Sequence, residues 1–378
     1  MSRPLPLLLL CLLCAACTET PVDPHAGHGD AGPFDSTPIA PAPGEALWVV
    51  NGQGPSFTVV ALDGVELPDG GVDASRIRVH GTVALSGVRF PHHVSLSPDR
   101  SFLVVADPGM DFSRGHNHAD GGLGMDMQGA LLKLDARTGQ ALAGTMLARM
   151  NHNGAISADG REVWTTAMTN PGQALVLDAR TLQPLAEPIT LTDQGAPQDG
   201  ATEVTFSPDG RRAFVANGLS GTLSVLDVAS RQLTYTLRVG RDPVGAWPGA
   251  DGRMYADNEL GQTLSVVDPG GPGEPRVLRS IDLGFTPGMA AATPEGQLWV
   301  SDSTNGQVVV YPPGGAVPLA AVPTGAGAHG LAFSPSHRLL FVTNQWEDSL
   351  SVVDVQARQV IQRLPTGRAP NGLVYRSP

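Results

Sequence analysis

The chain has 378 residues, of which 41% are hydrophobic, 5% aromatic and 16% charged. Its formal net charge of -12 opposes contact with the negative backbone of nucleic acids, so we expect no nucleic-acid partner. The length suits one large domain or two small ones.

The N-terminus has the features of an export signal. Arg3 precedes an apolar run from Leu5 to Leu13, and the small-residue segment Cys14-Ala15-Ala16-Cys17 follows. The run is shorter than the roughly 20 residues of a membrane-spanning helix. A cysteine directly after two alanines resembles the lipobox of bacterial lipoproteins, in which that cysteine is acylated. We therefore expect residues 1–16 to be a lipoprotein signal peptide and Cys17 to be the lipidation site. Leucine is usual where Cys14 stands, so cleavage without a lipid is an open alternative.

The residues that follow Cys17 predict a tether. Residues 17–44 are rich in Pro, Gly, Ala, Asp and Thr, and such a segment buries too little apolar surface to offset its ordering entropy. The resemblance to lipoproteins implies an exported protein anchored to a membrane. It implies a periplasmic or cell-surface location, and Thr18 rather than Asp after the cysteine favours the outer membrane.

From residue 45 onward the chain repeats itself. A short apolar strand ends in a Ser-Pro-Asp-Gly turn or a relative of it, typical of tight turns. The turns are Ser97-Pro98-Asp99-Arg100, Ser157-Ala158-Asp159-Gly160, Ser207-Pro208-Asp209-Gly210, Gly249-Ala250-Asp251-Gly252, Thr293-Pro294-Glu295-Gly296 and Ser334-Pro335-Ser336-His337. Each turn leads into a second strand, a polar loop, a third strand and a fourth. Four short strands in each repeat of about 40–45 residues predict an all-β propeller.

The number of repeats predicts seven blades over residues 45–378. Six turns begin complete repeats, and a seventh strand of the same kind, 371–375, ends the chain with nothing after it. The three strands that it lacks are expected at the other end, over 47–51, 57–63 and 76–80. We therefore expect the N- and C-terminal strands to close the last blade together, which removes an open sheet edge.

Three short motifs near the C-terminus resemble a known repeat. Val342-Thr343-Asn344, Ser351-Val352-Val353-Asp354 and Pro365-Thr366-Gly367 are similar to the YVTN-type (YncE-like) β-propeller repeat. This resemblance implies the fold and is nearly silent about activity, because one fold hosts many functions.

Histidines recur at one position of the repeat. Five residues before each turn motif, which we call the channel-start position, the seven blades have His92, His152, Thr202, Val244, Gly288, His329 and Asn371. His93 comes next to the first of them. Innermost strands of a propeller line its central channel, so we expect four imidazoles at one mouth of the channel. Glu203, beside Thr202, is the best channel carboxylate and a candidate general base.

The first complete repeat contains an insertion between its second and third strands, on the same face as that mouth. It holds His116 and His118, and Asp107 stands at the end of the preceding strand. We predict a transition-metal site (Cu, Zn or Fe), because imidazole suits these ions and a carboxylate can bind the ion or orient a histidine. The predicted site residues are His92, His93, His152, His329, His116, His118 and Asp107. By contrast, His80, His337 and the Asn and Asp residues at the ends of second strands (Asn51, Asn217, Asp257, Asp302, Asn344) are interpreted as structural.

Pro91-His92-His93 with the other first-strand histidines also resembles the histidine-lined copper site of nitrous oxide reductase, another seven-bladed propeller. Thr202, Val244, Gly288 and Asn371 depart from that pattern, and no second copper domain follows, so its activity is not implied.

Three functions are compatible with these features. The first is a monomeric binding or scaffold module, anchored by its lipid, whose propeller face presents loops to a protein, a glycan or a metal. The alternatives are a metal-dependent oxidoreductase and a lactonase-like hydrolase, because propellers that cleave sugar lactones share these repeats.

Overall fold

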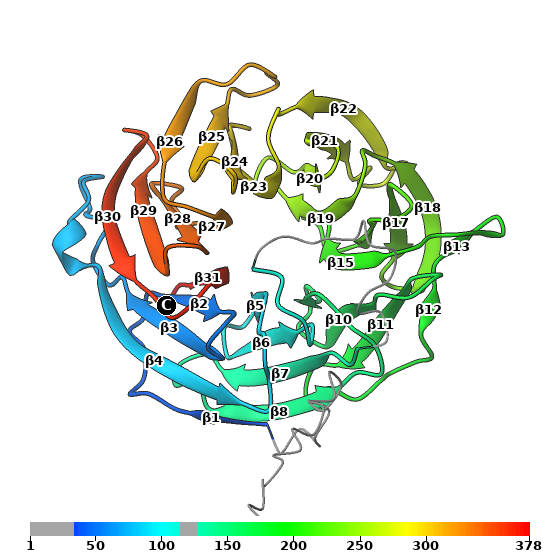
Figure 1. The fold of residues 1–378 in the computed structure, drawn as a ribbon, viewed down its shortest axis with the longest axis horizontal. Helices are drawn as coiled ribbons and strands as arrows, with labels where there is room; N and C mark the ends of the chain where they lie inside the picture. Colours follow the sequence, from blue (N-terminus) through cyan, green and yellow to red (C-terminus); the bar gives the residue numbers. More distant parts are fainter. Residues whose placement is uncertain (1–33, 114–126) are drawn as a thin grey trace, which may run out of the picture. The chain divides into compact units, whose positions relative to one another are not determined.

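A computed structural model of the chain describes residues 34–113 and 127–378. In this part of the chain seven antiparallel sheets form the blades of a β-propeller (Figure 1), as the repeats predict. From the inner to the outer strand, blades 1 to 3 are β5 (Val94–Leu96), β6 (Phe102–Asp107), β7 (Ala130–Asp135) and β8 (Ala141–Met146); β9 (Gly154–Ile156), β10 (Glu162–Ala167), β11 (Gln173–Asp178) and β12 (Ile189–Thr190); and β15 (Ala201–Phe206), β16 (Arg212–Asn217), β17 (Thr222–Asp227) and β18 (Gln232–Arg238).

Blades 4 to 6 follow the same order. They are β19 (Pro243–Pro248), β20 (Met254–Asn258), β21 (Thr263–Asp268) and β22 (Arg276–Asp282); β23 (Pro287–Ala292), β24 (Leu298–Asp302), β25 (Gln307–Tyr311) and β26 (Ala320–Pro323); and β27 (Ala328–Phe333), β28 (Leu339–Asn344), β29 (Ser349–Asp354) and β30 (Gln359–Pro365). A small hairpin, β13 (Thr192–Asp193) with β14 (Ala196–Pro197), lies between blades 2 and 3.

The seventh blade joins both ends of the chain, as expected. Its strands are β31 (Pro370–Arg376), β2 (Ala46–Asn51), β3 (Ser56–Ala61), β4 (Arg78–Ser86) and β1 (Asp35–Thr37), with a 3-10 turn, η1 (Ala74–Arg76), before β4. Leu47, Trp48 and Val49 of β2 pair with Tyr375, Val374 and Leu373 of β31. The closing strand therefore takes the innermost place, next to the channel (Figure 1).

The propeller begins about ten residues before its predicted start at residue 45, within the segment 17–44 that was predicted to be a tether. Strand β1 pairs with β4, and the backbone N–H groups of Ile39 and Ala42 donate to the carbonyls of Thr138 and Arg137 in blade 1. Phe34 packs against Gly144 of β8, where a side chain would collide with its ring. Phe34 and Ile39 are thus two apolar residues in a segment that has few others. By packing on the propeller they hold this segment against blades 7 and 1.

The predicted turns and strand ends are held by side-chain hydrogen bonds. In blade 3, Ser207 Oγ donates to Asp209 at 2.6 Å, and the same oxygen accepts from the N–H of Arg212 at 3.0 Å. At the other end of the second strand, the Asn217 amide donates to Thr222 and Ser224 of the third strand. Equivalent amides do this in blades 4, 6 and 7, namely Asn258, Asn344 and Asn51.

The hydrophobic core lies between neighbouring blades. Phe214 and Val225 of blade 3, for example, pack with Met254 and Val267 of blade 4. Trp48, Trp164 and Trp299, all on second strands, are completely buried. Burying a large apolar side chain stabilises the fold by about 1.5–3 kcal/mol, so each blade depends on both of its neighbours. No helix in the described ranges is long and apolar enough to span a membrane.

Deleting residues 370–378 tests ring closure. The deletion leaves the backbone groups and apolar side chains of β2 without the strand that covers them, so we expect insoluble protein or a melting temperature lowered by at least about 10 °C. Thermal unfolding followed by circular dichroism measures the change. Deleting only Ser377 and Pro378, which lie beyond β31, is the matched control and should change little. An unchanged melting temperature in the longer deletion would contradict the closure.

Candidate metal centre at the channel mouth

The innermost strands bring the four predicted histidines of the repeats to the channel mouth. His92, His93, His152 and His329 are all buried, with at most 8% of any of them exposed. Nitrogen atoms of His92, His93 and His152, one from each ring, all lie within 4.8 Å of one another. The centroid of the His92 ring is 4.5 Å from that of His93 and 4.4 Å from that of His152. These three form a compact group, which we call the His triad.

His329 lies beside the triad. The centroid of its ring is 6.1 Å from that of His92 and equally far from that of His93. Blade 5 holds it in place, because the Ser301 hydroxyl donates to its backbone carbonyl at 2.7 Å. Thr166 and Thr343, at the corresponding place in blades 2 and 6, hold Thr202 and Asn371 in the same way. The backbones of His329, Thr202 and Asn371 are thus each held by the preceding blade.

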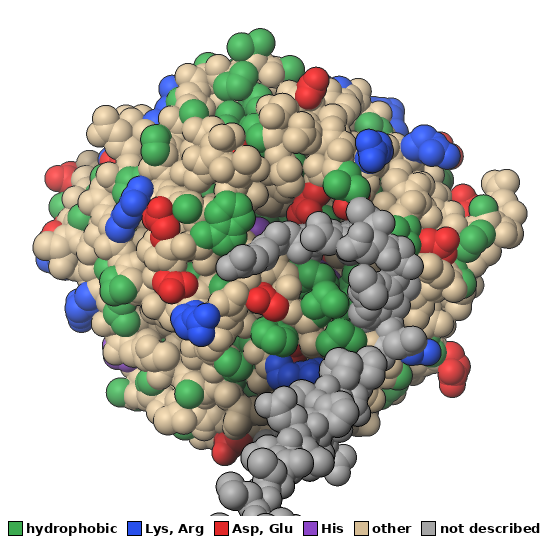
Figure 2. Space-filling view, viewed as in Figure 1, with side chains coloured by type: hydrophobic (Ala, Val, Ile, Leu, Met, Phe, Trp, Pro, Cys, Tyr) green, Lys and Arg blue, Asp and Glu red, His purple; other side chains and the backbone are tan. Residues whose placement is uncertain are grey.

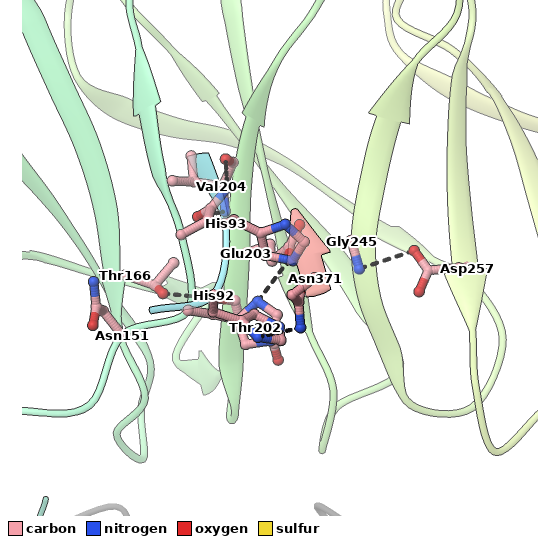
Figure 3. A network of polar contacts seen from close by, with 12 residues as sticks. His92, His93, Asn151, Thr166, Thr202, Glu203, Val204, Gly245, Asp257 and Asn371 are labelled. Atoms are coloured by element: carbon pink, nitrogen blue, oxygen red, sulfur yellow. Dashed lines mark hydrogen bonds and ion pairs between the residues drawn. The ribbon is translucent and has the colours of Figure 1, made fainter. Parts of the chain in front are cut away.

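Glu203, which Figure 3 labels beside His93, connects two members of the triad. One of its oxygens, Oε1, lies 2.8 Å from Nε2 of His93 and 2.7 Å from Nδ1 of His152. The side chain is completely buried, so the two imidazoles supply the polar contact that a buried carboxylate needs. The sequence indicated Glu203 as a channel carboxylate and a candidate general base, and the structure pairs it with histidines from two blades. A signal was present in the sequence, because Glu203 and His93 occupy the same place in the repeat, one residue after the channel-start position.

Asn371 of the closing strand completes the surroundings of His92. Its amide lies 2.6 Å from Nδ1 of His92, and the N–H of Gly372 donates to the His92 carbonyl. Gly372 is required here, since a Cβ atom at this residue would lie 2.8 Å from Cα of His93. The end of the chain therefore helps to orient the first histidine pair.

Asp107 supports this pair without joining the triad. Its carboxylate accepts hydrogen bonds from the backbone N–H groups of Arg89, Phe90 and Gly109 at 2.7–3.2 Å. Both oxygens are therefore engaged with backbone, and the interpretation of Asp107 as a metal ligand is not supported by this geometry. It acts as a positioning residue, because the segment that it holds leads directly into His92.

The other predicted residues are distributed as follows. His116 and His118 lie outside the described residues. His80, interpreted as structural, bonds the Ala40 carbonyl from outer strand β4, and His337 packs against Phe333 at a turn. Asp257 differs from the strand-end residues with which it was grouped: Asn258 has that role, and Asp257 points towards the innermost strand of its own blade.

Asp257 and Trp247 form the side of the site next to Glu203. The Asp257 carboxyl accepts from the indole N–H of Trp247 at 2.7 Å and from the backbone of Gly245 at 3.1 Å. The Trp247 ring lies 5.8 Å from that of His93. Complete burial, and then the negative charges of Glu259 and Glu203, raise the pKa of Asp257 well above its usual value.

No family model and no curated protein matches this chain. Solved structures do. The periplasmic gluconolactonase of Pseudomonas aeruginosa superposes with a TM-score of 0.66 at 22% identity, over 88% of this chain and 99% of that one. A protein of unknown function from Desulfotomaculum acetoxidans gives 0.66 at 15% identity over the same shares. Hydrazine synthase of Kuenenia stuttgartiensis gives 0.57 at 18% identity, over 75% and 88%.

These likenesses establish the seven-bladed propeller fold. At such low sequence identities, no active-site residue of these proteins can be assigned to a position of this chain.

Asp257→Asn tests the electrostatics of this side of the site. Because the pKa of Asp257 is raised in the folded state, the folded protein holds this proton where the unfolded chain, with a value near 3.9, loses it. Its contribution to stability therefore falls as the pH rises through that window. The asparagine keeps the acceptor oxygen and removes the titration. We expect the wild type to lose stability relative to the variant as the pH rises, in urea unfolding between pH 4 and 9.

Asp209→Asn is the control with the opposite sign. The Ser207 hydroxyl lowers the pKa of Asp209, so its contribution is present above the unfolded value and is lost as the pH falls. Parallel curves for the wild type and Asp257→Asn would contradict the assignment of a raised pKa.

Proposed function

We propose that this protein binds a transition-metal ion at the mouth of its channel through His92, His93 and His152. The observation that carries the proposal is the convergence of three buried imidazoles, from two blades, within 4.8 Å of one another. The three rings thus offer one ligand atom each to a single ion. The neutral imidazole ring is a ligand of zinc, copper and iron, and these are the ions that we propose.

Glu203 is the positioning carboxylate of the proposed site. It takes one ring nitrogen each of His93 and His152, which selects their tautomers and makes the rings better electron-pair donors. Asn371 and Asp107 play a similar part for His92, one through its ring and the other through the backbone before it. Three histidine ligands leave a coordination position for water or a small ligand, as in catalytic zinc sites.

A metal-dependent oxidoreductase is an alternative function that would use the same site, because it also requires the ion to be bound there. For the lactonase-like hydrolase, the supporting observation is the shared fold of the gluconolactonase, which is a likeness of architecture. The geometry at the channel mouth supports metal binding itself and favours neither of these two reactions.

We further propose that the protein is an exported, lipid-anchored member of the YVTN-type propellers, attached to the outer membrane through Cys17. The apolar run, the small residues before Cys17 and the Val-Thr-Asn repeat motif support this proposal. The chain from Phe34 onward would then be held away from the membrane by the residues before it.

Replacing His92 and His152 together by alanine tests the metal site. The change removes two of three ligands, so we expect protein stripped with chelator and reloaded with Zn²⁺ or Co²⁺ to lose its stoichiometric metal. Elemental analysis of protein without a polyhistidine tag measures the content, and the visible absorption of bound Co²⁺ reports ligand geometry. Glu203→Gln keeps the ligands and should weaken affinity by about 10–100-fold.

His80→Ala is the matched control, since His80 lies on outer strand β4, away from the channel, and bonds the backbone carbonyl of Ala40. It should retain full metal content. Circular dichroism and melting curves establish that each variant is folded. Equal metal content in the double variant and the wild type, or no stoichiometric uptake by the wild type, would refute the proposed centre.

Cys17→Ser tests the anchor. The serine cannot form the thioether to diacylglycerol, so we expect the protein to move from the membrane fraction to the soluble exported fraction and to lose palmitate label. Cys14→Ser, which leaves Cys17 in place, should keep the label. Wild-type protein that never takes up the label would show that the signal is cleaved without lipidation.

A further inference from the structure

A second pocket lies on the same face of the propeller, beside the channel mouth. It has a volume of about 530 Å³, within the range of about 300–1,000 Å³ for small-molecule sites. Loops of blades 6, 7 and 1 line it, through Gln53, Ser113, Gln345, Trp346, Asp348 and Arg368. Figure 2 views this face, on which histidine is visible near the centre among hydrophobic and acidic side chains.

Trp346 is the aromatic wall of the pocket. Half of its surface is exposed (51%), whereas Trp48, Trp164 and Trp299 are completely buried. Its indole N–H donates to the Ser113 carbonyl at 2.9 Å, and the ring lies so close to Gly327 that a Cβ there would be 2.8 Å away. The ring is therefore held rigidly while much of its apolar face remains in water. A fixed, exposed indole offers a large contact area at little entropic cost.

Gln345 supplies a polar group that lacks a partner. It is only 5% exposed, and its side-chain nitrogen Nε2 makes no hydrogen bond within the described ranges. A buried amide that donates no hydrogen bond is unfavourable, and native proteins rarely leave one in that state. Because Gln345 lines the pocket, we infer that its amide turns towards a bound molecule and donates to an acceptor atom on it.

The polar rim is already arranged. Arg368 donates to the Gln53 side chain at 3.0 Å, and Gln53 donates to Ser113 and to Asp111, each at 2.9 Å. Asp348 accepts the backbone N–H of Ala369 at 2.8 Å. Arg368 retains N–H groups and Asp348 retains lone pairs beyond these contacts, so the rim offers both donors and acceptors.

We propose that this pocket binds a sugar ring of an uncharged glycan. A pyranose presents C–H groups on its faces, which suit a rigid indole, and hydroxyls around its edge, which both donate and accept. The hydroxyls match Gln345, Arg368 and Asp348 together, whereas an inorganic anion would match Arg368 and be repelled by Asp348. No residue of the His triad lines this pocket, so the glycan proposal does not depend on the metal proposal.

Isothermal titration calorimetry with cellotriose, maltotriose and chitotriose tests the proposal, with gluconate and inorganic phosphate as the anionic arms. We expect at least one trisaccharide to bind saturably with 1:1 stoichiometry and the anions not to bind at the same concentrations. Trp346→Ala and Gln345→Leu should each weaken that binding by about tenfold or more, which corresponds to about 1.4 kcal/mol.

Leu260→Ala is the matched control, because Leu260 is a similarly exposed apolar residue in the corresponding loop of blade 4. It should leave the affinity unchanged. Metal content and sugar affinity are separate measurements on separate variants, so failure of the metal proposal is distinguishable from failure of this one. Saturable binding of phosphate or gluconate alone, no binding of any trisaccharide, or full affinity in folded Trp346→Ala and Gln345→Leu would overturn the proposal.

Discussion

The pairing of β31 with β2 is the interaction on which the rest of this structure depends. In a propeller each blade is stabilised by two neighbours, so an open ring would leave one blade face and one sheet edge in water. Closure also has a local consequence at the site. The same strand that pairs with β2 brings Asn371 to His92 and seats Gly372 beneath His93. The geometry of the His triad is therefore linked to the completeness of the ring.

Polar groups at the channel mouth are held by bonds that cross from blade to blade. Hydroxyls of second strands bond the backbone of the next blade's innermost strand, and Asn153 of blade 2 bonds both backbone groups of Val204 in blade 3. Glu203 extends this network to side chains, by joining histidines of blades 1 and 2 to blade 3. Such networks allow a buried site to be polar and rigid at once, which is what a metal centre requires.

One segment connects the two sites on this face. The ring of Phe112 packs against His92 and His152, with centroids 5.7 and 5.3 Å away, and the carbonyl of the next residue, Ser113, holds Trp346. Phe112 and Ser113, which follow β6 at the start of the blade 1 insertion, therefore lie between the proposed metal centre and the proposed glycan pocket. A ligand in the pocket would lie beside the mouth of the channel.

The sequence by itself determined the fold, the number of blades and the set of histidines at the mouth, because a radial repeat turns equal positions in sequence into equal positions around one axis. It also contained Glu203 and His93 at matching places. It could not reveal that Phe34 and Ile39 extend the propeller. Two apolar residues in a segment otherwise poor in apolar residues add stability only where the folded chain offers a surface against which they pack, here at Gly144 and Gly81.

Only the tertiary structure decided which of the predicted residues meet. Asp107 turned out to bond backbone, Asn258 rather than Asp257 proved to be the strand-end amide, and Trp346 and Gln345 came together with Gln53 across blades. The physical reason is that a repeat specifies where a Cα atom lies around the ring. The direction of a side chain and the identity of its partners depend on contacts between residues more than 300 positions apart in the sequence, as between Arg368 and Gln53.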